Sequence, residues 1–141
     1  MRNNGLTLNA IDSIVVSCPL SNQRTFMVVV VRTLAKRSEF DKLLVSAINE
    51  ALNSLGKSVE QSIYFHMENQ FNVARKQIPE NLVEFQGGLE KIFGAGSMFI
   101  EIQIMKNLHR KIGVPLKMES EQFEFVKYVG VAKRGFLEKA K

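Results

Sequence analysis

Apolar residues recur at helical spacing through the middle of the chain. Between Phe40 and Leu55 they fall three or four positions apart, which places them along one side of a helix. Ser38 precedes this run and Asp41 follows three positions later, a pattern close to a capping box. Gly56 comes directly after the run, as a C-terminal cap residue would. The pattern therefore predicts a helix that begins at Ser38 and ends before Gly56.

The same start signal appears again a few residues later. Ser58 is followed three positions on by Gln61, and apolar residues continue at helical spacing as far as Phe71. Because only Gly56 and Lys57 separate the two runs, we expect the helices to pack as a helical hairpin.

A third helix is predicted to begin near Pro79, since proline is favoured at the first helical position. Gly87 and Gly88 lie inside this helix, and each glycine costs about 1 kcal/mol relative to alanine. Gly88 is next to the apolar face, so we expect another helix to approach it closely.

The segment Gly94-Ala95-Gly96-Ser97 looks at first like a phosphate-binding loop. However, position 99 is phenylalanine rather than the third glycine of a dinucleotide fingerprint, and no Gly-Lys-Ser/Thr ending follows. The segment also follows a helical pattern, not a strand. We therefore interpret it as a structural turn in which Gly94 ends one helix, Gly96 turns the chain and Ser97 caps the next helix.

The segment after this turn carries two patterns. Residues 100–104 alternate between apolar and polar, as a strand does, but Phe99, Ile102, Met105 and Ile112 follow helical spacing. Basic residues fill the last turns, where they stabilise a helix dipole. A helix is favoured over a strand, and we expect it to be the most buried.

The two ends of the chain are less regular than its middle. Residues 10–16 and 25–32 are rich in β-branched side chains, which indicates a short β-hairpin unless residues 1–26 are a disordered extension. Residues 122–131 also alternate like a strand, although Ser120 as a cap favours a fifth helix.

The predicted fold class is mainly α, a compact bundle of four to five helices. We expect three parts: a basic N-terminal flank over 1–37, a helical core domain over 38–113, and a basic, helical C-terminal segment over 114–141.

Composition narrows the class of protein further. The 141 residues are 45% hydrophobic and 23% charged, as in an ordinary globular protein, and include the single cysteine Cys18. One cysteine excludes an internal disulfide framework and fits a reducing compartment. No apolar run reaches the roughly 18 residues of a membrane span. We therefore expect a cytoplasmic protein without a membrane partner.

The formal charge of +5 is concentrated in the flanks. Residues 1–37 contain five basic and one acidic side chain, whereas 38–113 contain eight basic and nine acidic ones. Nucleic-acid binding would therefore use the flanks. The candidate contacts are Arg32, Lys36, Arg37, Lys133 and Arg134.

Catalytic and metal-binding motifs are incomplete. His66 and Glu68 have the His-x-Glu spacing of zinc deaminases, but the Pro-Cys-x-x-Cys partner is missing. We therefore expect no metal, no cofactor and no enzyme activity. Glu101 lies between two isoleucines and needs a polar partner if its helix is buried. Tyr64, His66 and Glu101 are the candidate polar cluster.

Two longer stretches, "SIYFHMENQF" and "FQGGLEKIFGAGSMFIEIQIMKNLHRKIG", resemble small archaeal domains of the Nitrosopumilus output domain type. The resemblance covers residues 42–113. The residues that carry it are Leu55, Gly56, Tyr64, His66, Leu89, Ile92, Phe93, Gly94, Gly96, Glu101, Leu108 and Gly113. It implies an all-helical module in signalling or regulation, without an established activity.

These observations together predict a non-enzymatic interaction module that acts through protein contacts, with self-association as the first expectation. Several phenylalanines exceed what a four-helix core needs, which suits an interface. They are Phe71, Phe123, Phe125 and Phe136. The alternative is a protein that binds nucleic acid through its basic flanks. No small-molecule ligand is expected.

Overall fold

The computed structural model describes residues 23–117 and 122–139, with the side chains of 23–26 left aside. In these ranges the chain forms five α-helices, two short 3-10 helices and no strand. The elements are α2 (Gln23–Asn53), α3 (Lys57–Phe71), η2 (Arg75–Glu80), α4 (Leu82–Phe93), η3 (Gly94–Gly96), α5 (Ser97–Ile112) and α6 (Phe125–Lys139). The mainly α prediction is confirmed.

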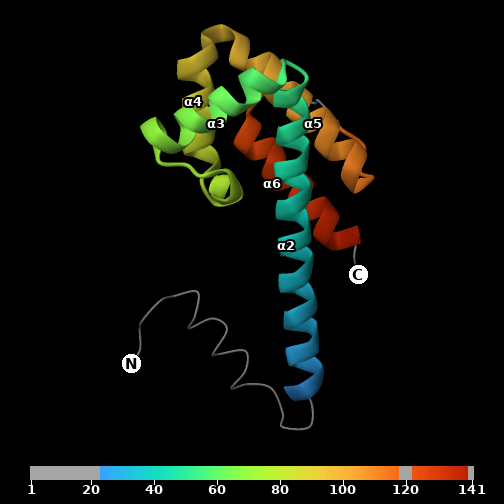
Figure 1. Ribbon diagram of the computed structural model, residues 1–141. Coiled ribbons are helices and arrows are strands. Elements are labelled where there is room, and N and C mark those ends of the chain that lie inside the picture. Colours follow the sequence, from blue (N-terminus) through green and yellow to red (C-terminus); the bar gives the residue numbers. More distant parts are fainter. Residues whose placement is uncertain (1–22, 118–121, 140–141) are drawn as a thin grey trace. The chain divides into compact units, whose positions relative to one another are not determined.

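The chain divides into two compact units, Met1–Lys36 and Arg37–Lys141. The described part of the first unit is the beginning of α2, and this helix continues into the second unit. Within the second unit, α3, α4, α5 and α6 gather around the later part of α2 (Figure 1). No helix in the described ranges is both long enough and apolar enough to cross a membrane.

The core of the second unit contains the apolar stripe predicted between Phe40 and Leu55, as far as Leu52. Phe40, Phe85 and Phe125 are its largest fully buried side chains. The ring centroids of Phe85 and Phe125 lie 6.3 Å apart, so α4 and α6 meet at these rings. The remaining buried members of α2 are Leu44, Ala47, Ile48, Ala51 and Leu52. Leu55, beyond the end of the helix, is exposed.

Helix α5 is the most deeply placed helix of this unit, as predicted. Nine of its residues are buried. The side chain of Asn107 donates a hydrogen bond to the backbone oxygen of Ala47 at 3.3 Å, which ties α5 to α2. Gly113 ends the helix with φ 72°, and its N–H bonds the oxygen of His109. The helical spacing therefore outweighed the short strand-like alternation.

The predicted start of the first helix is wrong. Ser38 lies inside α2, which begins at Gln23, and the run 25–32 is helical rather than a strand. The partner run of the expected hairpin, 10–16, lies outside the described residues. Valine costs only a few tenths of a kcal/mol more than the best helix formers. Because extending an existing helix does not require a new helical nucleus, this propensity cost of the valines is easily tolerated.

Three other predicted helix starts also differ from the structure. Gly56 (φ 120°), not Ser58, precedes α3 as its N-cap. Pro79 lies within η2, so α4 begins later, at Leu82. Ser97 is the buried first residue of α5 and makes no side-chain cap bond. In each case backbone geometry, rather than a side-chain oxygen, ends one helix and starts the next.

The C-terminal segment is helical, as the sequence favoured. Helix α6 begins at Phe125, while the predicted cap Ser120 lies outside the described residues. Phe125 is fully buried, and Phe123 and Phe136 pack against the core. Phe71 is also partly buried there. The excess of phenylalanine that suggested an interface is therefore largely used by the core.

Gly88 on α4 lies in close contact with α3. A Cβ added there would lie 2.6 Å from Sδ and 2.9 Å from Cε of Met67, and 3.1 Å from Cδ2 of Phe71. Met67 is fully buried, so it has little room to move. A Cβ on the neighbouring Gly87 would meet nothing within 4 Å. The close approach predicted at Gly88 is confirmed.

Substituting these two glycines separately tests this packing. We expect Gly88→Ala to lower the free energy of unfolding by about 1–2 kcal/mol, because overpacking outweighs the gain in helix propensity. Gly87→Ala has the same propensity gain without the clash and should be neutral or more stable by up to about 1 kcal/mol. Urea unfolding followed by circular dichroism measures both. Equal stability of the two variants would contradict the close contact.

Candidate functional site

A polar network joins α2, α3 and η2 on one side of the second unit. Its centre is Glu60, which is only 3% exposed although it carries a charge. Arg75 Nη2 donates to one carboxylate oxygen of Glu60 at 2.9 Å, and Lys57 Nζ donates to the other at 2.8 Å. The guanidinium of Arg75 also lies 4.2 Å from the ring centroid of Tyr64. Both oxygens of the buried charge are therefore satisfied.

The network ends at Asn49 on α2 and fixes the orientation of its amide. Arg75 Nε donates to Asn49 Oδ1 at 3.0 Å, and the hydroxyl of Tyr64 bonds the same oxygen. Because an arginine nitrogen can only donate, the atom that faces it must be the oxygen. The amide nitrogen of Asn49 is therefore directed elsewhere. Burial raises the pKa of Tyr64, so its hydroxyl keeps its proton.

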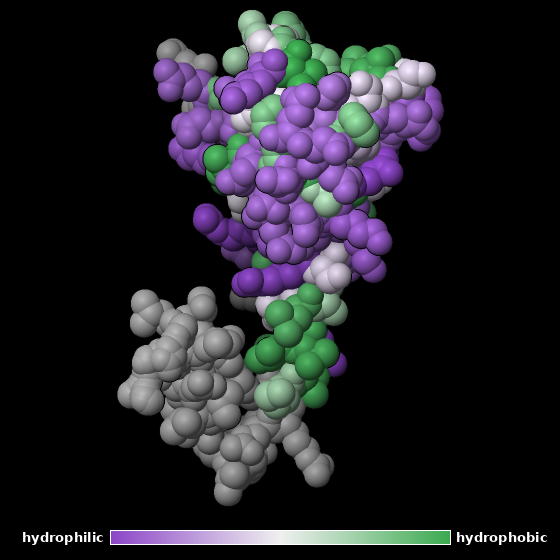
Figure 2. All heavy atoms as spheres, turned by 60° about the vertical axis from the view of Figure 1, so that its left-hand side comes forward, coloured by the Kyte–Doolittle hydropathy of each residue, from purple (hydrophilic) through white to green (hydrophobic). Residues whose placement is uncertain are grey.

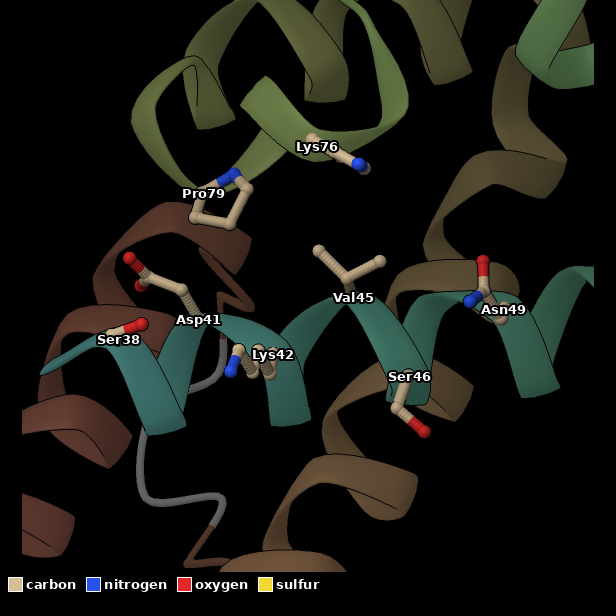
Figure 3. Close-up of a pocket in the computed structure, with 8 residues that line it drawn as sticks. All are labelled: Ser38, Asp41, Lys42, Val45, Ser46, Asn49, Lys76 and Pro79. Carbon is tan, nitrogen blue, oxygen red and sulfur yellow. The ribbon is translucent and has the colours of Figure 1, made fainter. Parts of the chain in front are cut away.

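A cleft of about 500 Å³ lies beside this network, between α2 and η2. Asp41, Val45 and Asn49 come from one side of α2, while Lys76 and Pro79 come from η2 (Figure 3). The remaining lining residues are Ser38, Lys42 and Ser46. The volume falls within the range of small-molecule sites. This cleft was not predicted from the sequence, because η2 was not expected as a separate element.

Asp41 is the acidic group of the cleft. Burial raises the pKa of its carboxyl, and the charge of Glu80 acts in the same direction, whereas Lys133 and Arg37 lower it. Lys133 Nζ lies 3.9 Å from Oδ1 of Asp41, a long ion pair. The carboxylate of Asp41 therefore has an ion-pair partner in Lys133, and the charge of Arg37 acts on it in the same direction.

Glu101 is a different kind of buried carboxyl. It is 3% exposed, its Oε1 has no hydrogen-bond partner among the described residues, and Gln86 reaches Oε2 only at 3.5 Å. Burial, with a further contribution from the charge of Glu90, raises the pKa of Glu101 to about 7. The carboxyl is thus partly protonated at neutral pH, which reduces the cost of leaving it unpaired.

The structure gives the three members of the predicted polar cluster separate partners. Tyr64 bonds Asn49, and Glu101 contacts Gln86. His66 Nδ1 lies 3.1 Å from the amide nitrogen of Gln70, one turn along α3. Of the cluster, only Tyr64 belongs to the network at Glu60. The signal that would have found this network is Glu60 itself, an acid at a position of α3 that faces inward.

The predicted nucleic-acid contacts fall in both units. Arg32 and Lys36 belong to the first unit, and Arg37, Lys133 and Arg134 to the second. Lys133 contacts Asp41 and also lies 5.9 Å from the ring centroid of Phe40. Arg32, Arg37 and Arg134 are exposed. Lys133 therefore already makes contacts within the second unit.

The first part of α2 presents apolar side chains to solvent. Met27 is 53% exposed, and Val31 and Leu34 are each 59% exposed. Val28 and Val29 have similar exposure. Figure 2 shows this stretch as hydrophobic, whereas the face of the second unit in that view is mainly hydrophilic. We call Met27–Leu34 the apolar stretch.

Comparison with known proteins gives no relative: no family model, curated protein or solved structure matches this chain. Within the described ranges, no three or more histidine, cysteine, aspartate or glutamate side chains lie together as a metal site would require.

Removing Arg75 tests the importance of the network. Arg75→Met leaves one oxygen of buried Glu60 without its donor, so we expect a loss of about 1–3 kcal/mol in the free energy of unfolding. The control Lys57→Met removes the more exposed partner and should cost less than about 1 kcal/mol. Chemical denaturation at neutral pH measures both. A smaller loss for Arg75→Met than for Lys57→Met would show that the network is not organised around Arg75.

Glu101 gives a pH-dependent prediction. Its pKa is about 7 when folded and near 4.5 when unfolded, so the folded state binds the proton more tightly. The stabilising effect of protonation is complete below pH about 4.5 and is lost as the pH rises through about 7. We expect Glu101→Gln to be more stable than wild type at pH 8 by about 2–3 kcal/mol and similar at pH 4.5.

Thermal unfolding between pH 4.5 and 8 checks this, with exposed Glu84→Gln on α4 as control. If the difference between wild type and Glu101→Gln stays constant across this range, Glu101 has an ordinary pKa in the folded protein.

Proposed function

We propose that this protein is a non-enzymatic interaction module that self-associates through the apolar stretch of α2. The observation that carries the proposal is the exposure of Met27, Val31 and Leu34 on one described helix. Burying a side chain of this size contributes about 1.5–3 kcal/mol. A second copy that covers these side chains would therefore supply a large driving force.

The spacing within the stretch supports pairing between helices. Met27, Val30 and Leu34 lie at i, i+3 and i+7, which is the a–d–a spacing of a coiled-coil seam. Val31 extends the same side, and Val29 lies on the opposite side of the helix. A short seam of this kind gives a modest affinity, suited to association that depends on protein concentration.

Two finer points rest on the sequence rather than on the geometry. The regulatory or signalling role follows from the resemblance to the archaeal output domains. We propose a cytoplasmic location because a single cysteine fits a reducing compartment. Both belong to the proposal.

Light scattering coupled to size-exclusion chromatography tests the self-association. We expect wild type to approach twice the 16.0 kDa monomer mass as the concentration rises. Met27→Gln combined with Leu34→Gln should weaken the dimer by at least about 100-fold, because four apolar side chains leave the interface. Both residues are exposed in one chain, so helix content should not change.

The matched control is Val29→Gln, which makes the same kind of change on the other side of the helix. It should leave the dimer affinity within about threefold of wild type. A monomer at all concentrations, or equal weakening by the control, would contradict pairing through this seam.

Nucleic-acid binding is the alternative proposal, based on the basic flanks. It has less support, because Lys133 is engaged with Asp41 and Phe40. The dependence of binding on salt concentration distinguishes the two proposals. Retention on DNA would fall steeply with salt, whereas a dimer between basic segments should persist as salt screens their repulsion.

A further inference from the structure

Another cleft of about 500 Å³ lies between α6 and the segment 113–117 that follows α5. We call it the α6 cleft. Its volume falls within the range of small-molecule sites, and most of its lining is apolar, as in such sites. The apolar side chains of the lining are Val114, Pro115, Leu116, Tyr128 and Val131.

The segment that forms one wall of the α6 cleft is held by hydrogen bonds to both neighbouring helices. His109 Nδ1, on α5, lies 2.7 Å from the backbone oxygen of Val114. Lys139 Nζ, on α6, donates to the backbone oxygen of Gly113 at 3.2 Å. The wall is therefore fixed in place by the fold itself.

The hydrogen bond to Val114 leaves the other ring nitrogen of His109 free. Because a carbonyl oxygen only accepts, Nδ1 must be the donor, and Nε2 has no partner among the described residues. His109 is only 8% exposed, yet in the described ranges Oε1 of Glu101 is the one fully buried side-chain oxygen or nitrogen without a partner. Nε2 must therefore reach the surface, where His109 lines the α6 cleft and an adjoining hollow on the α5 side.

The charged side chains that line the α6 cleft are cationic. Lys117 and Lys127 are exposed, and neither forms an ion pair with an acidic side chain of the described ranges. Lys106 and Arg110 line the adjoining hollow, and Arg110 is paired with Glu50. No described aspartate or glutamate lines either space. An anionic group therefore finds partners here, whereas a cationic group finds none.

We propose that the α6 cleft binds a small carboxylate with an apolar body. The apolar body lies against Leu116, Tyr128 and Val131, and the carboxylate faces Lys117 and Lys127. The site belongs to the second unit and does not include the apolar stretch, so it does not depend on the proposed self-association. It gives the module a small-molecule ligand, which was not predicted from the sequence.

Isothermal titration with octanoate tests the proposal. We expect octanoate to bind wild type, octanol to bind more weakly because it lacks the charge, and octylammonium not to bind because its charge is reversed. The double variant Lys117→Met, Lys127→Met keeps apolar stems at both positions but removes their charges. It should lose about tenfold in affinity for octanoate, because each exposed ion pair contributes a few-fold.

Val131→Thr tests the apolar part of the α6 cleft. Val131 is 53% exposed, so this change of similar shape should leave the fold intact. It should weaken octanoate by about threefold or more, because a hydroxyl replaces a methyl group that the ligand covers.

The imidazole groups show where octanoate binds, because the chain has only two histidines. In NMR spectra of the ring nitrogens, octanoate should shift the signals of His109. The signals of His66 should stay unchanged, because His66 lies on α3 and does not line the α6 cleft.

Two controls separate this site from its neighbours. Lys106→Met removes a charge from the adjoining hollow but not from the α6 cleft, and Met27→Gln with Leu34→Gln removes apolar groups of the apolar stretch. Both should bind octanoate as wild type does, and circular dichroism should show that every variant is folded. Four results would overturn the proposal: no binding of octanoate at millimolar concentration, equal binding of octylammonium, unchanged affinity in the double lysine variant, or a loss of affinity in either control.

Discussion

The second unit depends on the burial of one side of α2. Between Phe40 and Leu52 this side is almost completely removed from water, and the other helices pack around it. Asn107 reaches the backbone of Ala47 from α5, and the ring of Phe136 lies 5.8 Å from that of Phe40. An adjacent side of the same helix supplies Asp41, Val45 and Asn49 to the cleft. The helix that organises the core therefore also forms one side of that cleft.

The two buried carboxyl groups, Glu60 and Glu101, are stabilised in different ways. Glu60 is paired through both oxygens with Arg75 and Lys57, so its charge holds α3 and η2 together. One oxygen of Glu101 has no partner in the described part of the chain, and the pKa of the carboxyl rises to about 7. Pairing fixes the orientation of Asn49 and hence one end of the cleft. Protonation instead makes stability depend on pH without defining a binding site.

The sequence predicted the helices better than their ends. Long apolar periodicity identified the helical run from Phe40 to Leu52 and the second helix α3, and Gly88 indicated a close approach that the structure confirms. The helix starts were less predictable. Ser38 and Ser58 look like N-caps but lie inside helices, because a local cap signal does not prevent a helix from starting earlier. The cleft was invisible for another reason: Asp41 and Lys76 are far apart in sequence, and only the fold of η2 against α2 brings them together. Tyr64, His66 and Glu101 seemed related because all are polar within apolar surroundings, but each finds a different partner.

If the protein self-associates through α2, hydrogen–deuterium exchange in the first part of this helix must depend on protein concentration. Helical amides near a helix end exchange quickly unless packing protects them. We expect the amides of residues 23–36 to become protected as protein concentration rises, while those of the buried part of α2 stay protected throughout. Fast exchange over residues 23–36 at every concentration would contradict the claim.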